Sequence, residues 1–318
     1  MKVLVTGGFG QVGSTVANML LQRGDKVLSI DNFATGRRDN LIHHPNLTEV
    51  EGTIVDPEII SRCFEDFKPD VVVHTAASYK DPNDWYSDSL VNAVGTANVA
   101  LACRAHDVKR LVYFQTALCY GTKPEQSPIT LDHPINPVNS SYAISKTAGE
   151  HYVQFSGVDW VTFRLANVIG ERNVSGPLPI FYSRLSEGKK CFVTEARRDF
   201  CYAGDLAKVV VRAADGAGNG TYHFSSGQDV AIKELYDAVV RAMKLNDYPV
   251  PDIHPLGSDD AASILLDPSR LFADYGDVSF TPLDEIARLA VERWSNEGVV
   301  GGYTHLKEAR GEIREAGK

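Results

Sequence analysis

Patterned cysteines, long apolar runs and an excess of positive charge are absent from this chain of 318 residues. Its five cysteines form no CxxC pair and no spacing typical of a metal site. They exclude a disulfide scaffold and predict reduced thiols in a cytoplasmic protein, with no bound metal. No apolar stretch approaches the ~20 residues that span a bilayer, so the sequence predicts no association with a membrane.

Basic residues are outnumbered, with 32 lysines and arginines against 41 aspartates and glutamates and a net charge of −9. Because there is also no long basic run, we expect no nucleic-acid partner, although a few local arginines can still bind a small anion. The hydrophobic fraction of 43% and the charged fraction of 23% are typical of globular proteins. The length suits about two domains.

Short apolar runs alternate with amphipathic stretches through the first half of the chain. Strands are expected at residues 3–5, 27–31, 47–51, 71–73, 110–114 and 160–165. Helices are expected at residues 11–23, 57–67 and 85–106. Continuous apolar strands between helices are typical of a parallel sheet covered on both faces. The sequence therefore predicts an α/β fold with a Rossmann-like, doubly wound parallel sheet.

The alternation weakens after Asn167, where the GPLP segment at residues 176–179 breaks the pattern. Further helices are expected at residues 232–243 and 282–297, a loop or edge strand at 249–255, and a polar tail from 301. We predict a dinucleotide-binding domain at residues 1–168, to which part of 200–226 returns. Residues 169–318 would form a smaller mixed α/β lobe that binds substrate, with the polar tail.

Three glycines, Gly7, Gly10 and Gly13, lie between the first strand and the first helix with GxxGxxG spacing. They permit the tight turn, the approach of a pyrophosphate to the backbone, and close packing of helix on strand. Asp31 ends the second strand, 18 residues after Gly13, where a carboxylate can bind a ribose 2′-hydroxyl. This position of Asp31 favours NAD over NADP. Two nearby arginines at residues 37–38 could accept a 2′-phosphate, so NADP binding stays open.

Tyr142 and Lys146 stand four residues apart, and on a helix they would share one face. A tyrosine has a pKa near 10, but a neighbouring ammonium and an oxidised nicotinamide both favour its phenolate. Such a pair suits acid/base chemistry beside NAD. Alone, the spacing is equally compatible with an ordinary helix start.

At this point the chain resembles the extended short-chain dehydrogenases/reductases, in their nucleotide-sugar epimerase and dehydratase branch. The resemblance covers about residues 1–295, and the order and spacing of its motifs are specific. The motifs are TGGFGQVG from Thr6, DNFATG from Asp31, HTAA from His74, NAVGT from Asn92, QTALCYG from Gln115, YAISK from Tyr142, RLANVIG from Arg164 and RRDF from Arg197.

This resemblance implies an NAD-dependent enzyme acting on a nucleotide-diphosphate sugar, with UDP as the first expectation for the nucleotide. Tyr142 would be the acid/base, Lys146 its activator and ribose ligand, and Thr116 the hydroxyl that bonds the reacting sugar oxygen. Together with Tyr142 and Lys146, the implied cofactor contacts are Gly7, Phe9, Gly10, Gln11, Val12, Gly13, Asp31, Asn32, Thr53, Ile54, Thr75, Ala76, Ala77 and Asn92. With Thr116, the implied substrate contacts are Lys80, Asn167, Arg198 and Asp260.

Two positions depart from the family pattern. Gly257 stands where a second phosphate-binding arginine is usual, so Lys80 is a candidate for the second arm of the clamp. Thr53 stands where an adenine-binding aspartate is usual, and we expect its contribution to be small.

The residues after Thr116 separate the chemistries of this branch. Dehydratases carry Asp-Glu there and sugar-acid decarboxylases a glutamate at the second place, but here Ala117 and Leu118 follow. Neither can transfer a proton, and a 4-epimerase needs no further acid or base. The sequence thus favours NAD-dependent 4-epimerisation through a 4-keto sugar, while Cys119 and His223 remain open as other proton carriers.

Two alternatives stay open: a 4,6-dehydratase or 4-keto reductase of the same branch, and a non-enzymatic NAD(P)-sensing protein. The intact Tyr142 and Lys146 speak against the sensor. By analogy with the family, we expect a homodimer formed through the helices at residues 85–106 and 142–155.

Overall fold

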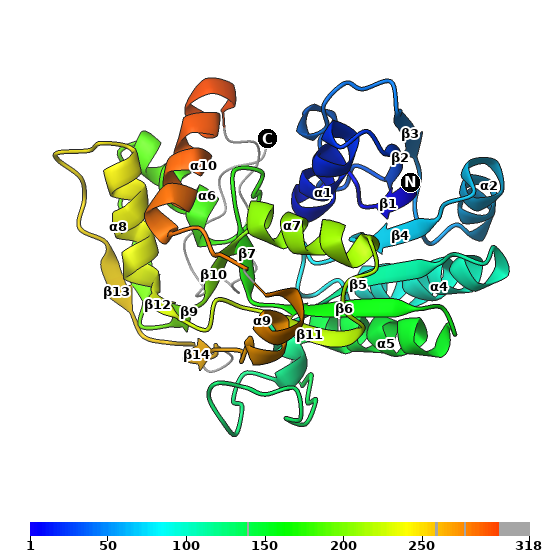
Figure 1. Cartoon of the computed structure of the whole chain (residues 1–318). Coiled ribbons are helices and arrows are strands. Elements are labelled where there is room, and N and C mark those ends of the chain that lie inside the picture. The colour runs from blue at the N-terminus through cyan, green and yellow to red at the C-terminus, as the bar shows by residue number, and fades with distance from the viewer. Residues whose placement is uncertain (139, 258–259, 277, 299–318) are drawn as a thin grey trace.

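The computed structural model describes residues 1–138, 140–257, 260–276 and 278–298. A seven-stranded sheet runs through it in the order β11-β6-β5-β4-β1-β2-β3, and every neighbouring pair is parallel (Figure 1). The strands are β1 (Lys2–Thr6), β2 (Lys26–Asp31), β3 (Leu47–Glu51), β4 (Val71–His74), β5 (Arg110–Thr116), β6 (Trp160–Leu165) and β11 (Gly220–Phe224). The strand order reverses between β1 and β4, and a crevice forms there at the carboxyl ends of the strands. The predicted doubly wound α/β fold is confirmed.

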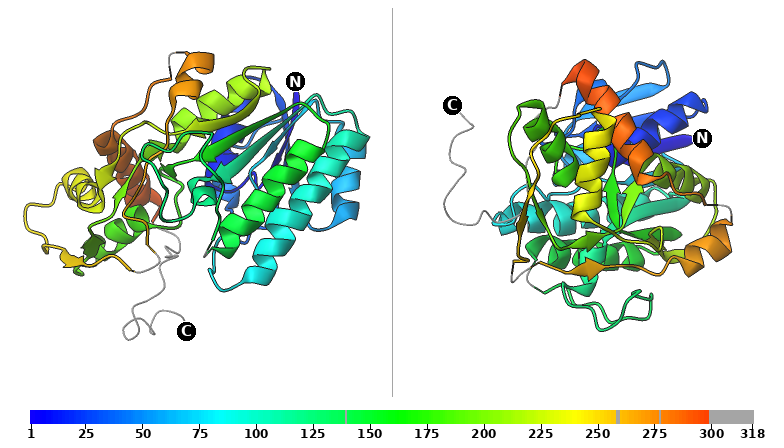
Figure 2. Two further views of the ribbon diagram at one scale, coloured as in Figure 1. Left: turned by 90° about the horizontal axis from the view of Figure 1, so that it is seen from below. Right: turned by 90° about the vertical axis from the view of Figure 1, so that its left-hand side faces the viewer.

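Helices cover both faces of this sheet, because alternate strand residues point to opposite sides. Val3 and Val5 pack with α1 (Gln11–Gln22) and α7 (Ala203–Ala214). Leu4, between them, belongs to the core under α2 (Pro57–Phe67), α4 (Thr96–Ala105) and α5 (Ser141–Phe155). Figure 2 shows α2, α4 and α5 side by side on one face.

The stretch predicted as one helix at residues 85–106 is interrupted. It contains α3 (Trp85–Asp88), a π-helical segment η2 (Ser89–Gly95) and then α4. The π turn bulges a helix locally, often at functional sites, and Asn92 lies within it.

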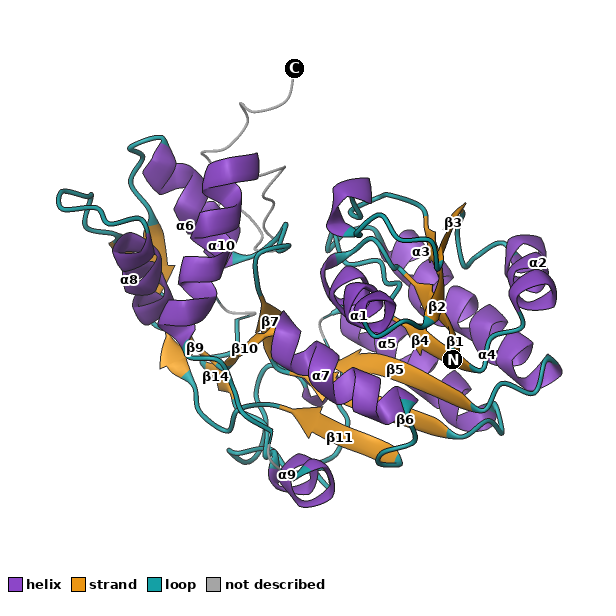
Figure 3. Cartoon of the chain, turned by 45° about the horizontal axis from the view of Figure 1, so that its top comes forward, coloured by secondary structure: helices purple, strands orange, loops and turns teal. Residues whose placement is uncertain are grey.

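The second lobe has its own core, formed where α6 (Pro177–Ser186), α8 (Ile232–Ala242) and α10 (Leu283–Glu297) pack together (Figure 3). Three small sheets accompany them: β7 (Asn167–Ile169) with β10 (Phe200–Tyr202), β9 (Arg197–Arg198) between β12 (Val230–Ala231) and β14 (Ser263–Ile264), and β8 (Phe192–Thr194) with β13 (Asp252–His254). The short helix α9 (Ser269–Tyr275) packs against β11.

The GPLP segment does not interrupt the structure as expected but begins helix α6. Pro177 occupies its first turn, where the missing N–H has no intrahelical partner to lose. The segment from 200 to 226 supplies α7 and β11 to the first sheet and its face. The polar tail expected from residue 301 lies outside the described residues.

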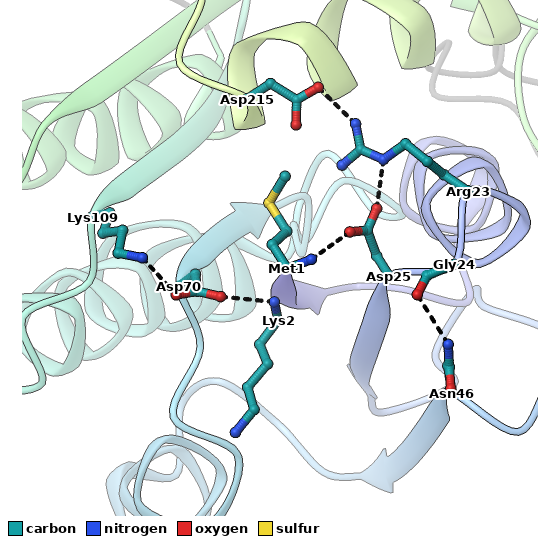
Figure 4. Close-up of polar contacts among 9 residues, drawn as sticks. All are labelled: Met1, Lys2, Arg23, Gly24, Asp25, Asn46, Asp70, Lys109 and Asp215. Carbon is teal, nitrogen blue, oxygen red and sulfur yellow. Dashed lines mark hydrogen bonds and ion pairs between the residues drawn. The ribbon is translucent and has the colours of Figure 1, made fainter.

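Ion pairs tie the amino-terminal edge of the sheet, opposite the crevice (Figure 4). Asp25, before β2, accepts from the Met1 amino group at 2.6 Å and from Arg23 at 2.6 Å. Arg23, at the end of α1, also bonds Asp215 after α7 at 2.6 Å. In the described part of the chain, no helix is both long enough and apolar enough to cross a membrane.

Candidate active site

The glycine loop between β1 and α1 forms a narrow cradle. Gly7 has φ +64°, and a Cβ there would lie 2.7 Å from the backbone of Ala76. A Cβ on Gly13 would lie 2.2 Å from the carbonyl oxygen of Gly7. No side chain caps the start of α1, so its first N–H groups can serve an anion. The loop therefore fits a pyrophosphate.

Asp31 is held by the same loop. Its carboxylate accepts from the Phe9 N–H at 2.9 Å and the Phe33 N–H at 2.8 Å. Burial raises the pKa of Asp31, and these N–H groups oppose the rise. Both nearby arginines are paired with carboxylates: Arg37 with Asp39, and Arg38 with Glu49 and Glu51. The pairing leaves less positive charge for a 2′-phosphate, which fits NAD rather than NADP.

The other implied cofactor residues surround this cradle. The Thr75 hydroxyl donates to the Thr6 carbonyl at 2.6 Å, and the Gln11 amide reaches the Val168 carbonyl of β7 at 3.3 Å. Ile54 is buried against Gly95 of η2, while the Thr53 hydroxyl is engaged by the Val55 N–H at 3.2 Å. Asn32 caps the turn that follows β2 by accepting from the Ala34 N–H, and Val12 and Ala77 are half-buried beside the loop.

A chain of hydrogen bonds joins β1, β4 and η2 through the buried His74. The Thr96 hydroxyl donates to the Asn92 carbonyl at 2.7 Å, so it accepts from His74 Nε2 at 2.9 Å. His74 Nδ1 then accepts from the Thr6 hydroxyl at 2.6 Å. Burial lowers the pKa of His74 to about 3, so it is a neutral structural link.

Asn92 connects the segment after β4 to helix α5, which carries Tyr142 and Lys146. Its side chain accepts from the Ser78 N–H at 2.8 Å and donates to the Ser78 carbonyl at 2.9 Å. The same amide donates to the Ser145 hydroxyl at 3.0 Å, next to Lys146. We read Asn92 as a support of the site rather than a reacting group.

Tyr142 and Lys146 lie one turn apart on α5, as their spacing predicts. The Lys146 ammonium lies 4.1 Å from the centre of the Tyr113 ring, whose hydroxyl donates to the Lys146 carbonyl at 3.0 Å. Burial lowers the pKa of Lys146 to about 7, and Glu150 opposes this. Burial, with Tyr79 and Asp88, raises the pKa of Tyr142. The chain's own groups thus do not lower the phenol's pKa, and the expected lowering of this pKa required an oxidised nicotinamide beside Lys146.

Thr116 ends β5 at the same edge of the sheet. Its hydroxyl accepts from the Leu118 N–H at 3.2 Å, which leaves the hydroxyl proton free to donate. Its own N–H donates to the Gln115 side chain at 2.8 Å.

The implied substrate residues fall into two groups. Arg198 on β9 donates to the Ala261 carbonyl at 2.9 Å. Burial lowers the pKa of the Arg198 guanidinium, and the negative charges of Asp260 and Asp229 oppose this lowering. Arg198 and Asp260 are therefore brought together. Asn167 at the start of β7 and Lys80 after β4 are exposed. Arg197 is exposed and pairs with Asp229, as expected of a solvated neighbour.

Two buried features were missed by sequence reasoning. Asp88, at the end of α3, is buried, and burial raises the pKa of its carboxyl while the hydroxyls of Ser141 and Ser78 oppose the rise. Glu150 and Arg164 form an ion pair beneath α5. The RLANVIG motif begins with Arg164, and Glu150 follows the YAISK motif after three residues, but no spacing rule connects the two.

Three comparisons place this site among known proteins. Residues 3–224 match the model of the "NAD dependent epimerase/dehydratase family". A UDP-glucose 4-epimerase of Mycolicibacterium smegmatis is 33% identical over 289 residues, 85% of this chain and 91% of that protein. The structure of the Bordetella bronchiseptica enzyme WbmH in complex with NAD⁺ superposes with TM-score 0.92 at 64% identity, over 94% of this chain and 99% of that one. WbmG of the same organism, in complex with NAD and UDP, gives 0.87 at 40% identity, over 96% and 97%.

Proposed function

The chain belongs to the NAD-dependent epimerase/dehydratase family, and from that premise we propose that it is a nucleotide-sugar 4-epimerase with Tyr142 as its acid/base. NAD is its cofactor, and sugar nucleotides are its substrate class. The glycine cradle and Asp31 are the proposed cofactor contacts on β1, α1 and β2, and Arg198 with Asp260 the proposed contacts to the nucleotide diphosphate.

The proposed reaction removes and restores one hydrogen at C4 of the sugar. When bound, NAD accepts a hydride from C4 and returns it. Tyr142 takes the proton of the 4-hydroxyl, Lys146 stabilises the phenolate, and Thr116 donates a hydrogen bond to the reacting oxygen. After the 4-keto sugar turns over in the pocket and its C4 is reduced again on the other face, Tyr142 returns its proton to the 4-oxygen, which becomes the inverted 4-hydroxyl.

The observation that carries this choice of chemistry is the lack of a second proton carrier beside Thr116 among the described residues. Ala117 and Leu118 have no acid group. Cys119 is fully buried, and burial raises its pKa to about 12. Burial lowers the pKa of His223 to about 4, and its ring nitrogens contact the Tyr120 hydroxyl and the Asp267 carbonyl. Epimerisation needs no such carrier, whereas elimination of water does.

A UDP sugar is the proposed substrate, supported by the UDP in the WbmG structure and by the name of the mycobacterial relative. Arg198 is the proposed phosphate-binding arm, since a guanidinium matches phosphate oxygens in a fork geometry. Lys80 is proposed as the second arm, in place of the arginine that Gly257 replaces.

We also propose that two copies pair through the outer face of α3, η2, α4 and α5. Apolar side chains there are 45% to 81% exposed. They are Trp85, Tyr86, Val94, Leu101, Ile144, Tyr152 and Phe155. A patch of this kind marks an interaction surface, and α4 and α5 pack together to make it one continuous face. The five free, buried cysteines support a cytoplasmic setting.

The proposed function is tested by incubating the protein with a panel of UDP-hexoses and UDP-uronic acids without added reductant. We expect inversion at C4 of one of them, followed by NMR of the sugar ring. A product lacking the elements of water would mean a dehydratase, and net reduction that consumes NADH a keto reductase. NAD binding without conversion of any sugar would mean a sensor.

A further inference from the structure

A buried network lies beneath the catalytic helix and is not used by the proposed reaction. Arg164 of β6 contacts both carboxylate oxygens of Glu150, at 3.2 Å each. Its third nitrogen donates to the Tyr120 hydroxyl at 2.6 Å. Glu150 is 1% exposed and Arg164 6%. Because water stabilises each ion, removing both charges from water is costly, and such pairs are weak contributors to stability.

Gln115 connects this ion pair to Thr116. Its amide nitrogen donates to Glu150 at 3.3 Å and to the Thr147 hydroxyl at 3.3 Å. Its amide oxygen accepts from the Thr116 N–H at 2.8 Å. The Glu150 carboxylate, the Gln115 amide and the Thr116 N–H thus form one continuous chain of hydrogen bonds from α5 to the end of β5.

Glu150 also lies one helical turn beyond Lys146, on the face of α5 that carries Tyr142. The Tyr113 ring of β5 lies against the Lys146 ammonium, and the neutral His74 of β4 lies close enough for the ammonium to lower its pKa further. Glu150 is the group that raises the pKa of Lys146 against its burial.

We propose that the Glu150–Arg164 ion pair is a positioning element for the reaction: through Gln115 it holds Thr116, and its carboxylate places a negative charge one turn from the Lys146 ammonium. This inference rests on the proposed function for its meaning, but its first test, a titration of Lys146, does not require turnover. In this proposal, Glu150 and Arg164 touch neither substrate nor cofactor. They act through Thr116 and Lys146.

The direct test titrates Lys146 by NMR in the holoenzyme labelled with ¹³C at the lysine Cε, its resonance assigned by loss in Lys146→Arg. Glu150→Gln keeps the shape and removes the charge, so the midpoint should fall by roughly one pH unit. Glu150→Asp keeps the charge and should stay close to the wild type. The matched control is Asp159→Asn, which also removes the carboxylate partner of a buried arginine, Arg110, at the far end of β5. It should leave the midpoint unchanged.

An equal midpoint in Glu150→Gln and the wild type would overturn the inference, as would an equal shift in Asp159→Asn. Glu150→Gln leaves Arg164 buried without its charged partner, which destabilises the fold. A second variant, Gln115→Leu, therefore keeps the ion pair and breaks only its connection to Thr116. Gln115→Leu should leave the Lys146 midpoint unchanged but lower kcat about tenfold through a misplaced Thr116. An undiminished kcat in Gln115→Leu would overturn the proposal even if Glu150→Gln fails to fold. A wild type that inverts no sugar would contradict the proposed function alone, because the NMR titration of Lys146 can still be carried out on it.

Discussion

Burial opposes both of the charges that Tyr142 and Lys146 would carry during catalysis. It raises the pKa of the phenol and lowers that of the ammonium to about 7, because water would stabilise each ion better than the protein does. The ammonium thus loses its proton readily near neutral pH. We infer that the oxidised nicotinamide is needed, in addition to Lys146, to favour the phenolate.

The depressed pKa of Lys146 has a consequence for stability. Below about pH 7 both the folded and the unfolded chain carry the proton, and the full cost of burying the ammonium is present. Between about 7 and the unfolded value near 10.4, only the unfolded chain keeps it, so stability rises with pH. Lys146→Met should therefore exceed the wild type in free energy of unfolding at pH 6, by a margin that shrinks at pH 9. Urea unfolding of both proteins at pH 6 and pH 9 measures this difference in stability. A difference that does not change with pH would contradict the lowered pKa of Lys146.

Arg198 is the residue on which the proposed substrate clamp depends. Loss of a charge-assisted hydrogen bond costs about 1.5–3 kcal/mol, so Arg198→Ala should weaken binding of the UDP sugar roughly tenfold or more. NAD binding should not change. Calorimetry with UDP and with NAD⁺ separates the two, and Arg197→Ala is the matched control because Arg197 pairs with Asp229 at the surface. Equal affinity for UDP in Arg198→Ala and the wild type would remove Arg198 from the site.

At the scale of elements, the packing of α5 against β5 and η2 sets the positions of the proposed catalytic residues Tyr142 and Lys146. Gly149 makes this close approach possible, because a Cβ there would lie 2.5 Å from the Tyr113 hydroxyl and 2.6 Å from the Asn92 carbonyl. Gly149→Ala should destabilise the fold by about 1–3 kcal/mol through overpacking. It should also slow turnover, since Tyr142 and Lys146 move with the helix.

Thermal unfolding and C4 inversion measure these two effects. Gln154→Ala is the control, because Gln154 is exposed on the same helix and its loss should change stability by no more than about 0.5 kcal/mol. A Gly149→Ala variant as stable and as active as Gln154→Ala would show that α5 can shift without consequence.

The same elements show what a sequence can and cannot predict here. The strands at 47–51 and 160–165 and the helix at 57–67 have the predicted bounds, because apolar periodicity and helix-stopping residues act locally. The π segment was missed, since no local periodicity marks it. The helix at Pro177 was missed because its proline was taken as a break, although a proline also fits the first turn of a helix. Likewise the motifs suffice to propose Tyr142 and Thr116 as site residues, but the ion pair of Glu150 with Arg164 exists only once α5 lies on β6.

At the scale of the whole molecule, the two lobes are joined by more than the chain. Arg293 of α10 donates to the Asn40 side chain at 3.1 Å, and Asn40 donates to the Phe9 carbonyl in the glycine loop at 2.8 Å. The second lobe is thus bonded to the glycine loop, the segment proposed to hold the cofactor.

The proposed dimer is tested at the same scale. Leu101 and Phe155 are 62% and 81% exposed on α4 and α5, and a charge on each would be buried in the pair. Leu101→Glu with Phe155→Glu should sediment as a single chain of 34.8 kDa, while the wild type sediments at twice that mass. Val250→Glu is the control, because Val250 is 72% exposed on the other lobe and should leave the pair intact. A wild type that sediments as one chain would contradict the pairing.

Comparison of Tyr142→Phe with the wild type tests the central claim most directly. With a UDP sugar that the wild type converts, bound NADH absorbance should rise transiently and the C4 epimer should form without added reductant. Tyr142→Phe keeps the ring and the fold but lacks the proton acceptor, so turnover should fall by roughly 10²–10⁴ and the transient should vanish. Near-normal C4 inversion by a folded, NAD-bound Tyr142→Phe variant would contradict the account.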